Sequence, residues 1–325
     1  MNEAFEFVRR FGAGINLGNS LDAPDETAWW NPPITRELIR FYRSEGFRSI
    51  RIPVTWSRHL SGDNDSIHSG FLARVREVVD WSLEEGFVVI INLHHEDDWL
   101  SPNRENEAMP RFVHLWEQIA RHFADCGESL VFEAFNEIRN GEDWVGTEEA
   151  CQAVSRLAER FVETVRAAGR CNASRYLMIP TYAASTGETA CRSWVRVAKD
   201  DRLIATVHCY APHEFTHQPN EPKEYDPAWC RRELESVYDR LKRIFIDCGV
   251  PVVVGEANVI QKNGIPAESG RIAWAHDIAQ LSVKNGIPLI VWEDGGQMQL
   301  VDRKKACWTH AQLAKTYLES DMNLT

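Results

Sequence analysis

The stretch VFEAFNEIRN, residues 131–140, decides the fold that we expect for this chain. Its first part is apolar and aromatic, which is typical of a parallel β-strand buried on both faces. The run ends abruptly in Asn136 and Glu137, so a carboxylate stands at the carboxyl end of the strand. In α/β barrels this end of each strand carries the reactive groups. We therefore expect Glu137 to take part in a reaction together with a second polar residue.

A second strand of the same design ends in another glutamate. Residues 251–256 read PVVVGE, which places Glu256 directly after an apolar, β-branched run. For Glu137 alone, a structural salt bridge would explain the residue about as well as catalysis does. Two acids at one barrel mouth, however, are the minimum set of groups for cleaving a glycosidic bond, with one acid as proton donor and the other as nucleophile or base.

The chain repeats one pattern, in which an amphipathic stretch ends and a short apolar run follows, usually directly after a glycine. This pattern places strands near residues 12, 48, 87, 130, 176, 203, 251 and 287. Helices fill the intervals, near residues 35–45, 70–85, 110–126, 147–168, 187–198, 227–247, 268–285 and 307–319. Eight alternating units in 325 residues predict an α/β fold, a closed (β/α)8 TIM barrel. No linker interrupts the series, so we expect one catalytic domain over residues 1–325.

Charge and composition restrict the partners. The formal net charge is −12 without an offsetting basic stripe, which argues against nucleic acid and anionic membrane as partners. No apolar run is long enough to span a bilayer, and no leader is visible in residues 1–11. The sequence as written therefore predicts a cytoplasmic protein, and a leader removed from it would make the protein secreted. We expect a monomer.

Polar and aromatic residues cluster at the carboxyl ends of the predicted strands. They include Asn16, Asn19, Arg51, His94, His95, Asn136, Glu137, His208, Tyr210, Glu256, Trp292 and Glu293. Packing does not easily explain such a ring. Arg51 and Tyr210 are candidates to keep the nucleophile ionised, and His208 is a candidate to exchange a proton with the donor. Asn136 is placed to bond a sugar 2-hydroxyl, and Trp292 offers a floor for a pyranose ring.

Other chemistries fit the sequence less well. Adjacent residues on a strand point to opposite faces, so we expect His94 and His95 not to share a metal ion, and we expect no metal centre. The string GAGINLGN lacks the G-x-G-x-x-G continuation of a dinucleotide-binding turn. No G-x-S-x-G elbow of a serine hydrolase occurs.

Taken together, seven strings resemble glycoside hydrolase family 5, a cellulase-type family of retaining barrel enzymes. They are GINLGNSLDAP (14–24), FRSIRIPVTW (47–56), INLHHE (91–96), FEAFNE (132–137), VHCYAPHEFTHQ (207–218), VVVGEANV (252–259) and IPLIVWEDGG (287–296). The resemblance implies that Glu137 is the general acid/base and Glu256 the nucleophile. It implies supporting roles for Arg51, His94, Asn136, His208, Tyr210 and Trp292, and substrate contacts by Asn19, Asp22, His95, His217 and Glu293. It also implies that no metal or organic cofactor is needed.

The chain departs from the family pattern on loops that face the substrate. Where related sequences read WGNP, this chain reads Trp29-Trp30-Asn31-Pro32, and we expect the additional Trp30 to narrow or roof the cleft and to contact substrate. Where they read W-D-N-G after the last strand, this chain has Trp292-Glu293-Asp294-Gly295. These changes preserve the reaction class and bear on the choice of sugar.

We therefore expect a retaining endo-β-1,4-glycanase of the endoglucanase or cellulase type, whose partner is a β-linked oligo- or polysaccharide. The reaction would pass through a covalent intermediate on Glu256, and the two carboxyl groups should lie about 5–5.5 Å apart. The alternatives are a β-mannanase, a xyloglucanase or another β-glycosidase acting on oligosaccharides, and a carbohydrate-binding barrel without catalysis.

Overall fold

Eight parallel strands close into a barrel within the part of the chain that the computed structural model describes, residues 3–62, 64–196, 200–218 and 223–321. Around the barrel the strands follow the order β1-β10-β9-β8-β7-β6-β5-β2. They span Ala13–Asn16 (β1), Ser49–Ile52 (β2), Val88–Asn92 (β5), Leu130–Glu133 (β6), Leu177–Pro180 (β7), Leu203–His208 (β8), Val252–Ala257 (β9) and Leu289–Val291 (β10). The predicted TIM barrel is confirmed, and each strand begins within two residues of its predicted position.

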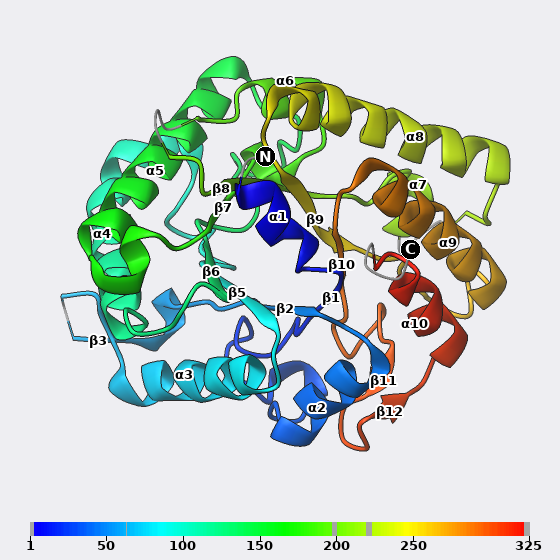
Figure 1. Cartoon of the computed structure of the whole chain (residues 1–325), viewed down its shortest axis with the longest axis horizontal. Helices are drawn as coiled ribbons and strands as arrows, with labels where there is room; N and C mark the ends of the chain where they lie inside the picture. Colours follow the sequence, from blue (N-terminus) through cyan, green and yellow to red (C-terminus); the bar gives the residue numbers. More distant parts are fainter. Residues whose placement is uncertain (1–2, 63, 197–199, 219–222, 322–325) are drawn as a thin grey trace.

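Helices form an outer layer around the barrel (Figure 1). The α-helices are Glu3–Arg9 (α1), Arg36–Glu45 (α2), Ser69–Glu84 (α3), Glu105–His122 (α4), Glu148–Ala167 (α5), Glu188–Arg192 (α6), His213–Thr216 (α7), Pro227–Ile244 (α8), Glu268–Asn285 (α9) and Ala311–Leu318 (α10). Short 3-10 helices lie at Ala28–Trp30 (η1), Ser57–His59 (η2), Pro102–Arg104 (η3), Arg170–Ala173 (η4), Tyr182–Ala184 (η5) and Ile246–Cys248 (η6). None of the described helices is both long and apolar enough to cross a membrane.

Local sequence explains several helix ends. The Thr35 hydroxyl accepts a hydrogen bond from the Leu38 amide at the start of α2, and Thr147 serves α5 in the same way. Such side-chain caps satisfy amides that have no partner inside the helix. Helix α2 ends at Gly46, whose φ of 117° is readily adopted only by glycine. The chain then enters β2 directly.

Three predicted helices have different bounds in the structure. The helix expected at 110–126 begins at Glu105, so Pro110 lies inside it, and it ends at His122. The helix expected at 187–198 ends at Arg192, and residues 197–198 lie outside the described residues. The helix expected at 307–319 begins only at Ala311. The residues before it form the hairpin Val301–Asp302 (β11) and Cys307–Trp308 (β12); a second hairpin joins Leu60–Ser61 (β3) and Ser66–Ile67 (β4).

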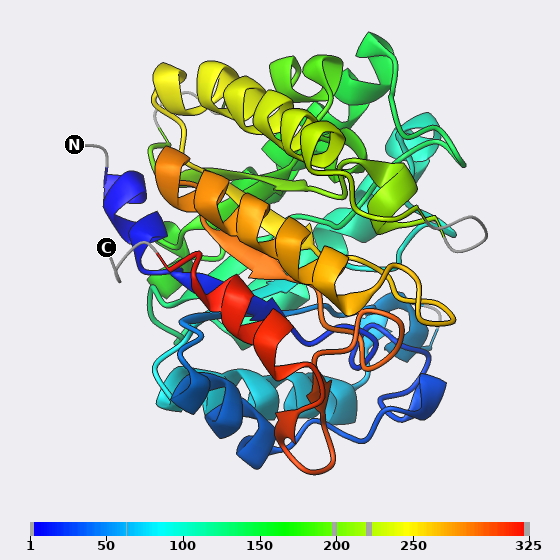
Figure 2. The same cartoon turned by 90° about the vertical axis from the view of Figure 1, so that its right-hand side faces the viewer.

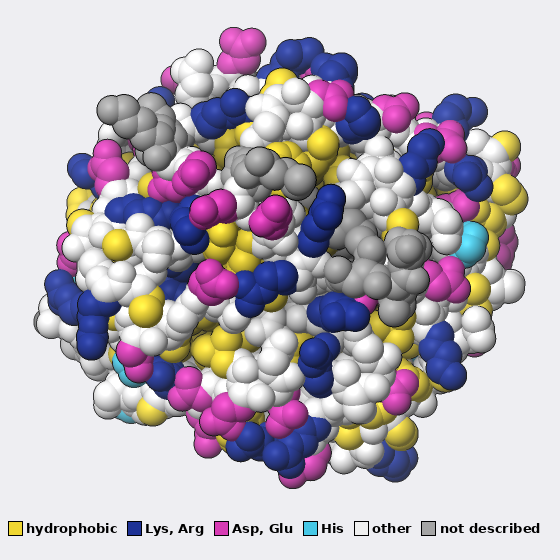
Figure 3. Space-filling view, in the orientation of Figure 1, with side chains coloured by type: hydrophobic (Ala, Val, Ile, Leu, Met, Phe, Trp, Pro, Cys, Tyr) yellow, Lys and Arg dark blue, Asp and Glu magenta, His cyan; other side chains and the backbone are white. Residues whose placement is uncertain are grey.

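Helix α1, which the sequence analysis did not predict, covers the amino-terminal end of the barrel (Figure 1). Phe7 stacks on Tyr176 with ring centroids 3.7 Å apart, and both rings belong to the core cluster that includes Ile90 and Val253 of the strands. On this face acidic and basic side chains are intermixed (Figure 3). The carboxyl ends of the strands open at the other end of the barrel, away from both termini (Figure 2).

Candidate active site

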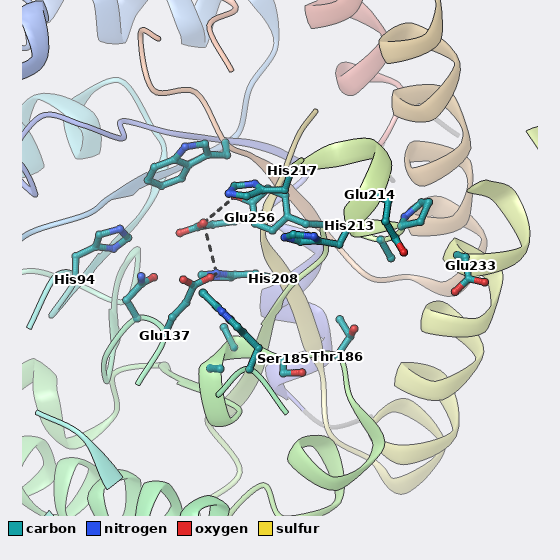
Figure 4. A pocket seen from close by; sticks show the side chains of 18 of the residues that line it. His94, Glu137, Ser185, Thr186, His208, His213, Glu214, His217, Glu233 and Glu256 are labelled. Carbon is teal, nitrogen blue, oxygen red and sulfur yellow. Dashed lines mark hydrogen bonds and ion pairs between the residues drawn. The ribbon is translucent and has the colours of Figure 1, made fainter. Parts of the chain in front are cut away.

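A cavity of about 810 Å³ lies at the carboxyl ends of the strands and contains both glutamates that the sequence singled out (Figure 4). Nine predicted site residues line it: His94, His95, Asn136, Glu137, His208, Tyr210, His217, Glu256 and Trp292. The lining also includes Trp144, Ser185, Thr186, His213, Glu214, Trp229 and Glu233, which the sequence analysis did not assign to the site. Residues from six strand ends, or from the segments after them, thus meet at one mouth, as expected for a barrel enzyme.

Glu256, on β9, is held at both carboxylate oxygens. Arg51 donates from Nη1 to Oε1 over 2.6 Å, and the Tyr210 hydroxyl donates to Oε2 over 3.0 Å. Burial raises the pKa of Glu256, whereas the charge of Arg51 opposes that rise. A buried carboxylate with a guanidinium on one oxygen and a hydroxyl donor on the other is suited to remain ionised and to attack.

Arg51 lies beneath the cavity, has no exposed surface, and forms hydrogen bonds with residues from several strands. Besides Glu256, it donates to the Glu133 carboxylate over 2.7 Å and to the Asn136 side-chain oxygen over 2.8 Å. Because the Asn136 oxygen accepts this bond, its NH2 group is left to face the cavity. Glu133, which the sequence analysis missed, is an acid inside an apolar strand. An acidic residue within an otherwise apolar strand is the sequence signal that could have identified Glu133 as a partner of Arg51.

Glu137 shares a hydrogen bond with His208, with 2.7 Å between Oε1 and Nδ1. About a fifth of the Glu137 side chain is exposed, whereas His208 is nearly buried. Burial lowers the pKa of His208 to about 4, so the ring is neutral near neutral pH. Burial raises the pKa of Glu137, against the charges of Arg139 and Arg51. Of the two glutamates, Glu137 is therefore the one suited to carry a proton, because Glu256 holds the charged hydrogen bond to Arg51.

The two glutamates are close together. One side-chain atom each of Glu137, His208 and Glu256 lies within 4.8 Å of the other two. His208 Nδ1 is also 3.4 Å from Glu256 Oε2. One carboxylate oxygen of each glutamate thus lies within 4.8 Å of the other. Retaining glycosidases hold their two carboxyl groups about 5–5.5 Å apart, whereas inverting enzymes hold them about 6.5–9.5 Å apart.

His94 and Trp292 form one wall of the cavity. Their rings are nearly parallel, 4° apart in orientation, with centroids separated by 5.8 Å. The Asn92 side-chain NH2 group lies 3.2 Å from His94 Nδ1 and can only donate there, because Val54 already occupies the Asn92 oxygen. The His94 proton therefore sits on Nε2, and burial keeps the pKa of this ring well below its usual value.

Asp22 and Asn19 support this wall from behind. Asp22 has no exposed surface, accepts hydrogen bonds from the backbone amides of Asn19 and Ser20, and lies 3.6 Å from His95 Nε2. Neither Asp22 nor Asn19 is among the residues that line the cavity. The structure therefore places Asp22 behind His95 and not at the cavity surface, where the sequence analysis expected it.

Among the residues that the structure describes, two groups of side chains have the spacing to hold a metal ion: Asp22 with His94 and His95, and Glu137 with His208 and Glu256. His94 and His95 do not point to opposite faces of a strand, contrary to the expectation from the sequence. Both residues follow β5, which ends at Asn92, so strand alternation does not apply to them. Their rings lie with centroids 4.5 Å apart. The Asp22 oxygens, however, already accept two backbone hydrogen bonds.

Glu293 does not reach the cavity, which corrects the expected substrate contact. Its side chain has no exposed surface and pairs with Arg303 at 2.7 Å. Tyr42 and the Gly295 amide also donate to its carboxylate. Arg303 in turn donates to the Gly18 carbonyl. The pair thus joins the loops after β1 and β10 and fixes the segment that carries Trp292.

Removing the charge of Glu293 should destabilise the protein because Arg303 would remain buried without a counter-ion. We expect Glu293→Gln to lower the free energy of unfolding by about 3–5 kcal/mol, measured by guanidinium denaturation. Glu319→Gln is the matched control, since Glu319 forms an exposed pair with His276, and such pairs contribute about 1 kcal/mol or less. An unchanged unfolding curve with a raised KM would instead support a direct contact with substrate.

Trp30 lies outside the cavity lining, with 93% of its surface exposed. The structure therefore does not place it as a roof over the two glutamates. It lies at the end of η1, in the loop after β1.

Trp144 and Arg139 belong to the loop after β6 and were not predicted as site residues. The Arg139 guanidinium lies 3.9 Å from the centroid of the Trp144 ring, close enough for a cation–π contact. Arg139 Nη1 also donates to the Glu137 carbonyl over 3.3 Å. The available signal was an isolated tryptophan in a polar loop directly after the catalytic strand.

Arg139 should set the upper pH limit of catalysis. Its charge opposes the raised pKa of Glu137, so Arg139→Gln should raise that pKa further. Because the acid must be protonated, activity falls as pH rises through this pKa. The alkaline limb of kcat/KM against pH should therefore move to higher pH in Arg139→Gln and stay in place in Arg139→Lys, which keeps the charge. A limb that moves equally in both variants would contradict an electrostatic role.

The chain is similar to several known proteins. Residues 12–297 match the family model described as Cellulase (glycosyl hydrolase family 5). The chain is 35% identical to Cellulase/esterase CelE of Acetivibrio thermocellus over 97% of its own length and 40% of that protein's length. It is 33% identical to Endoglucanase A of Clostridium longisporum over 100% of its own length and 67% of that protein's.

A solved structure resembles this chain both in sequence and in fold. The GH5-4 broad specificity endoglucanase from Clostridium acetobutylicum superposes with a TM-score of 0.91 at 32% identity. The match covers 98% of this chain and 99% of that one. The family resemblance noted in the sequence is thereby confirmed.

Proposed function

The chain belongs to glycosyl hydrolase family 5, the cellulase family, and we propose that it is a retaining endo-β-1,4-glucanase with Glu137 as general acid/base and Glu256 as nucleophile. One observation carries the assignment of roles. The two carboxylates lie close enough together to act on one glycosidic bond, yet of the two only Glu256 accepts the Arg51 hydrogen bond, while Glu137 is hydrogen-bonded to His208.

In the first step, a Glu256 oxygen attacks the anomeric carbon as the bond to the leaving oxygen breaks. Glu137 gives its proton to that oxygen, so the leaving sugar departs as a neutral alcohol. Arg51 and Tyr210 hold the Glu256 oxygens in place, and the free Asn136 NH2 group is positioned to bond the sugar 2-hydroxyl.

In the second step, water enters where the alcohol has left. Glu137, now ionised, removes a proton from this water, and the hydroxide attacks the glycosyl–Glu256 ester. The Glu256 carboxylate departs and regains its bond to Arg51. Two displacements at one carbon give a product with the starting anomeric configuration. Neutral His208 keeps Glu137 in place while its charge changes.

The cavity has two ends, which suggests how a glycan chain lies in it. His94, whose ring stacks on that of Trp292, lies on one side of Glu256, whereas Ser185, Thr186 and Glu233 lie on the other side of Glu137 (Figure 4). The aromatic side suits the sugar that is attacked, since its ring can stack on Trp292. The other end, with Trp144 and Trp229, would then hold the leaving part of the chain.

Xyloglucan, mixed-linkage glucan and mannan are the second candidates, and the open cavity of about 810 Å³ favours them as additional substrates. A broad opening can accept side branches on the leaving part of a chain. We also propose that residues 1–325 act as one catalytic domain, that the protein is a monomer, and that its partner is the glycan.

The test is release of reducing ends from soluble β-1,4-glucan, mixed-linkage β-glucan, mannan and xyloglucan, with Glu256→Ala beside the wild type. We expect β-1,4-glucan to be cleaved and the activity to vanish in the variant. Proton NMR of the first products should show the β-anomer. First products in the α-configuration would contradict retention. Binding without turnover on all four glycans would favour a carbohydrate-binding barrel.

A further inference from the structure

Two adjacent tryptophans stand out on the surface of the loop after β1. Trp29 is 44% exposed and Trp30 is 93% exposed. We call these two residues the Trp29–Trp30 platform. A tryptophan this exposed contributes little to packing in the protein itself, and aromatic rings at a surface are suited to contacts with another molecule.

The backbone at the platform is also unfavourable. Trp29 has a φ of 55° and Trp30 a φ of 65°, both in the left-handed region that bulky residues rarely adopt. Two consecutive bulky residues in this conformation persist only where the surroundings impose it, and such strain gathers at functional sites. Neither the packing nor the backbone thus accounts for a tryptophan at position 30.

The loop holds the platform firmly from both sides. On one side, Asp25 accepts hydrogen bonds from the Thr27 amide and hydroxyl. On the other side, the buried Asn31 side chain donates to the carbonyls of Asn19 and Asp294, each over 3.0 Å. The rings therefore stand on a fixed support, which limits the entropy lost when a ligand binds.

The same contacts join the platform to one end of the catalytic cavity. Asp294 follows the segment of Trp292, and Asn19 adjoins Asp22, which supports His95. Both Trp292 and His95 line the cavity. In Figure 2 the loop of η1 lies at the end of the barrel where the strands open, near the loop after β10. The platform thus extends the Trp292 side of the cleft beyond the cavity.

We propose that the Trp29–Trp30 platform is a distal subsite for the non-reducing part of a β-glucan chain, beyond the sugar that is attacked. The inference rests on the proposed function, because that function places the attacked sugar on Trp292. A pyranose ring of a chain leaving the cavity on this side would stack on Trp30. Only chains long enough to reach from Glu256 past His95 would gain affinity, so the subsite would favour polymers over short oligosaccharides.

The experiment measures how affinity depends on chain length. Cellotriose, cellohexaose and soluble β-1,4-glucan are titrated by calorimetry into Glu256→Gln, which cannot turn them over, with and without Trp30→Gly. We expect Trp30→Gly to weaken polymer binding about tenfold, roughly the contribution of one stacked aromatic ring, and to weaken it progressively less as the chain becomes shorter. Trp30→Tyr, which keeps a ring, should retain most of the polymer affinity.

Two controls separate binding from folding. Trp30→Gly relieves the positive φ, so its melting temperature should equal or exceed that of the parent, and a loss of affinity then does not reflect unfolding. Val145→Ala removes an exposed apolar side chain that belongs to the loop after β6 and does not line the cavity. It should not change the ratio of polymer to cellotriose affinity.

An unchanged affinity ratio in Trp30→Gly overturns the platform. If sedimentation then also shows that the substitution dissolves a dimer, the rings contact a second copy of the chain and not the glycan. A wild type that cleaves no β-glucan and a Glu256→Gln variant that binds none would instead refute the proposed function, on which the platform depends. Cleavage by the wild type with an unchanged ratio would refute the platform alone.

Discussion

Glu256→Ala should lower kcat on soluble β-1,4-glucan by a factor on the order of 10⁶, the loss seen when a covalent nucleophile is removed. Glu256 would make the bond to the anomeric carbon, and both Arg51 and Tyr210 donate hydrogen bonds to its carboxylate. Water cannot replace it efficiently, because the remaining base, Glu137, lies on the leaving-group side. The measurement is release of reducing ends, with circular dichroism to verify that the variant folds.

A small anion should restore part of this loss. Alanine leaves a space beside the Arg51 guanidinium and the Tyr210 hydroxyl, and formate or azide can occupy it. With an aryl β-glucoside as substrate, attack from this side would give the α-azide, a product of inverted configuration. A β-azide, or no effect of the anions on an otherwise folded protein, would contradict the assignment of Glu256 as nucleophile.

The strands could be predicted from the sequence because each is buried on both faces and therefore apolar over its whole length. Leu130–Glu133 and Val252–Ala257 illustrate this, with every residue buried. The hairpin at Cys307–Trp308 could not be predicted, since its conformation depends on pairing with Val301–Asp302 and on packing of Trp308 against Phe41. Such tertiary contacts override the local preference for a helix.

The closeness of Glu137 and Glu256 could also be predicted. Each follows a parallel strand, and the carboxyl ends of the strands in a barrel meet at one mouth. What the sequence could not reveal was burial. Glu293 stands at the end of β10 like a site residue, yet its partner Arg303 encloses it. Trp144 and Thr186 come from two separate loops and Trp229 from helix α8, and only the closed barrel brings them to the same cavity.

Glu137→Ala should affect substrates differently according to their leaving group. On β-1,4-glucan, whose leaving alcohol must be protonated, we expect kcat/KM to fall by about 10²–10⁴. On a dinitrophenyl β-cellobioside, the leaving phenolate needs no proton, so the first displacement should proceed at nearly the wild-type rate. The second displacement would still lack its base. A rapid burst of dinitrophenol followed by a slow steady state is therefore expected in stopped-flow measurements.

Azide separates the two steps of Glu137→Ala because it attacks the glycosyl–Glu256 ester without needing a base. It should speed the slow steady state and give the β-azide, since two displacements restore the starting configuration. The alkaline limb of the pH profile should also disappear on the activated substrate, because Glu137 no longer has to hold a proton. Equal losses on glucan and on the dinitrophenyl substrate would mean that Glu137 does not act as the acid, and its hydrogen bond to His208 would then have only a structural role.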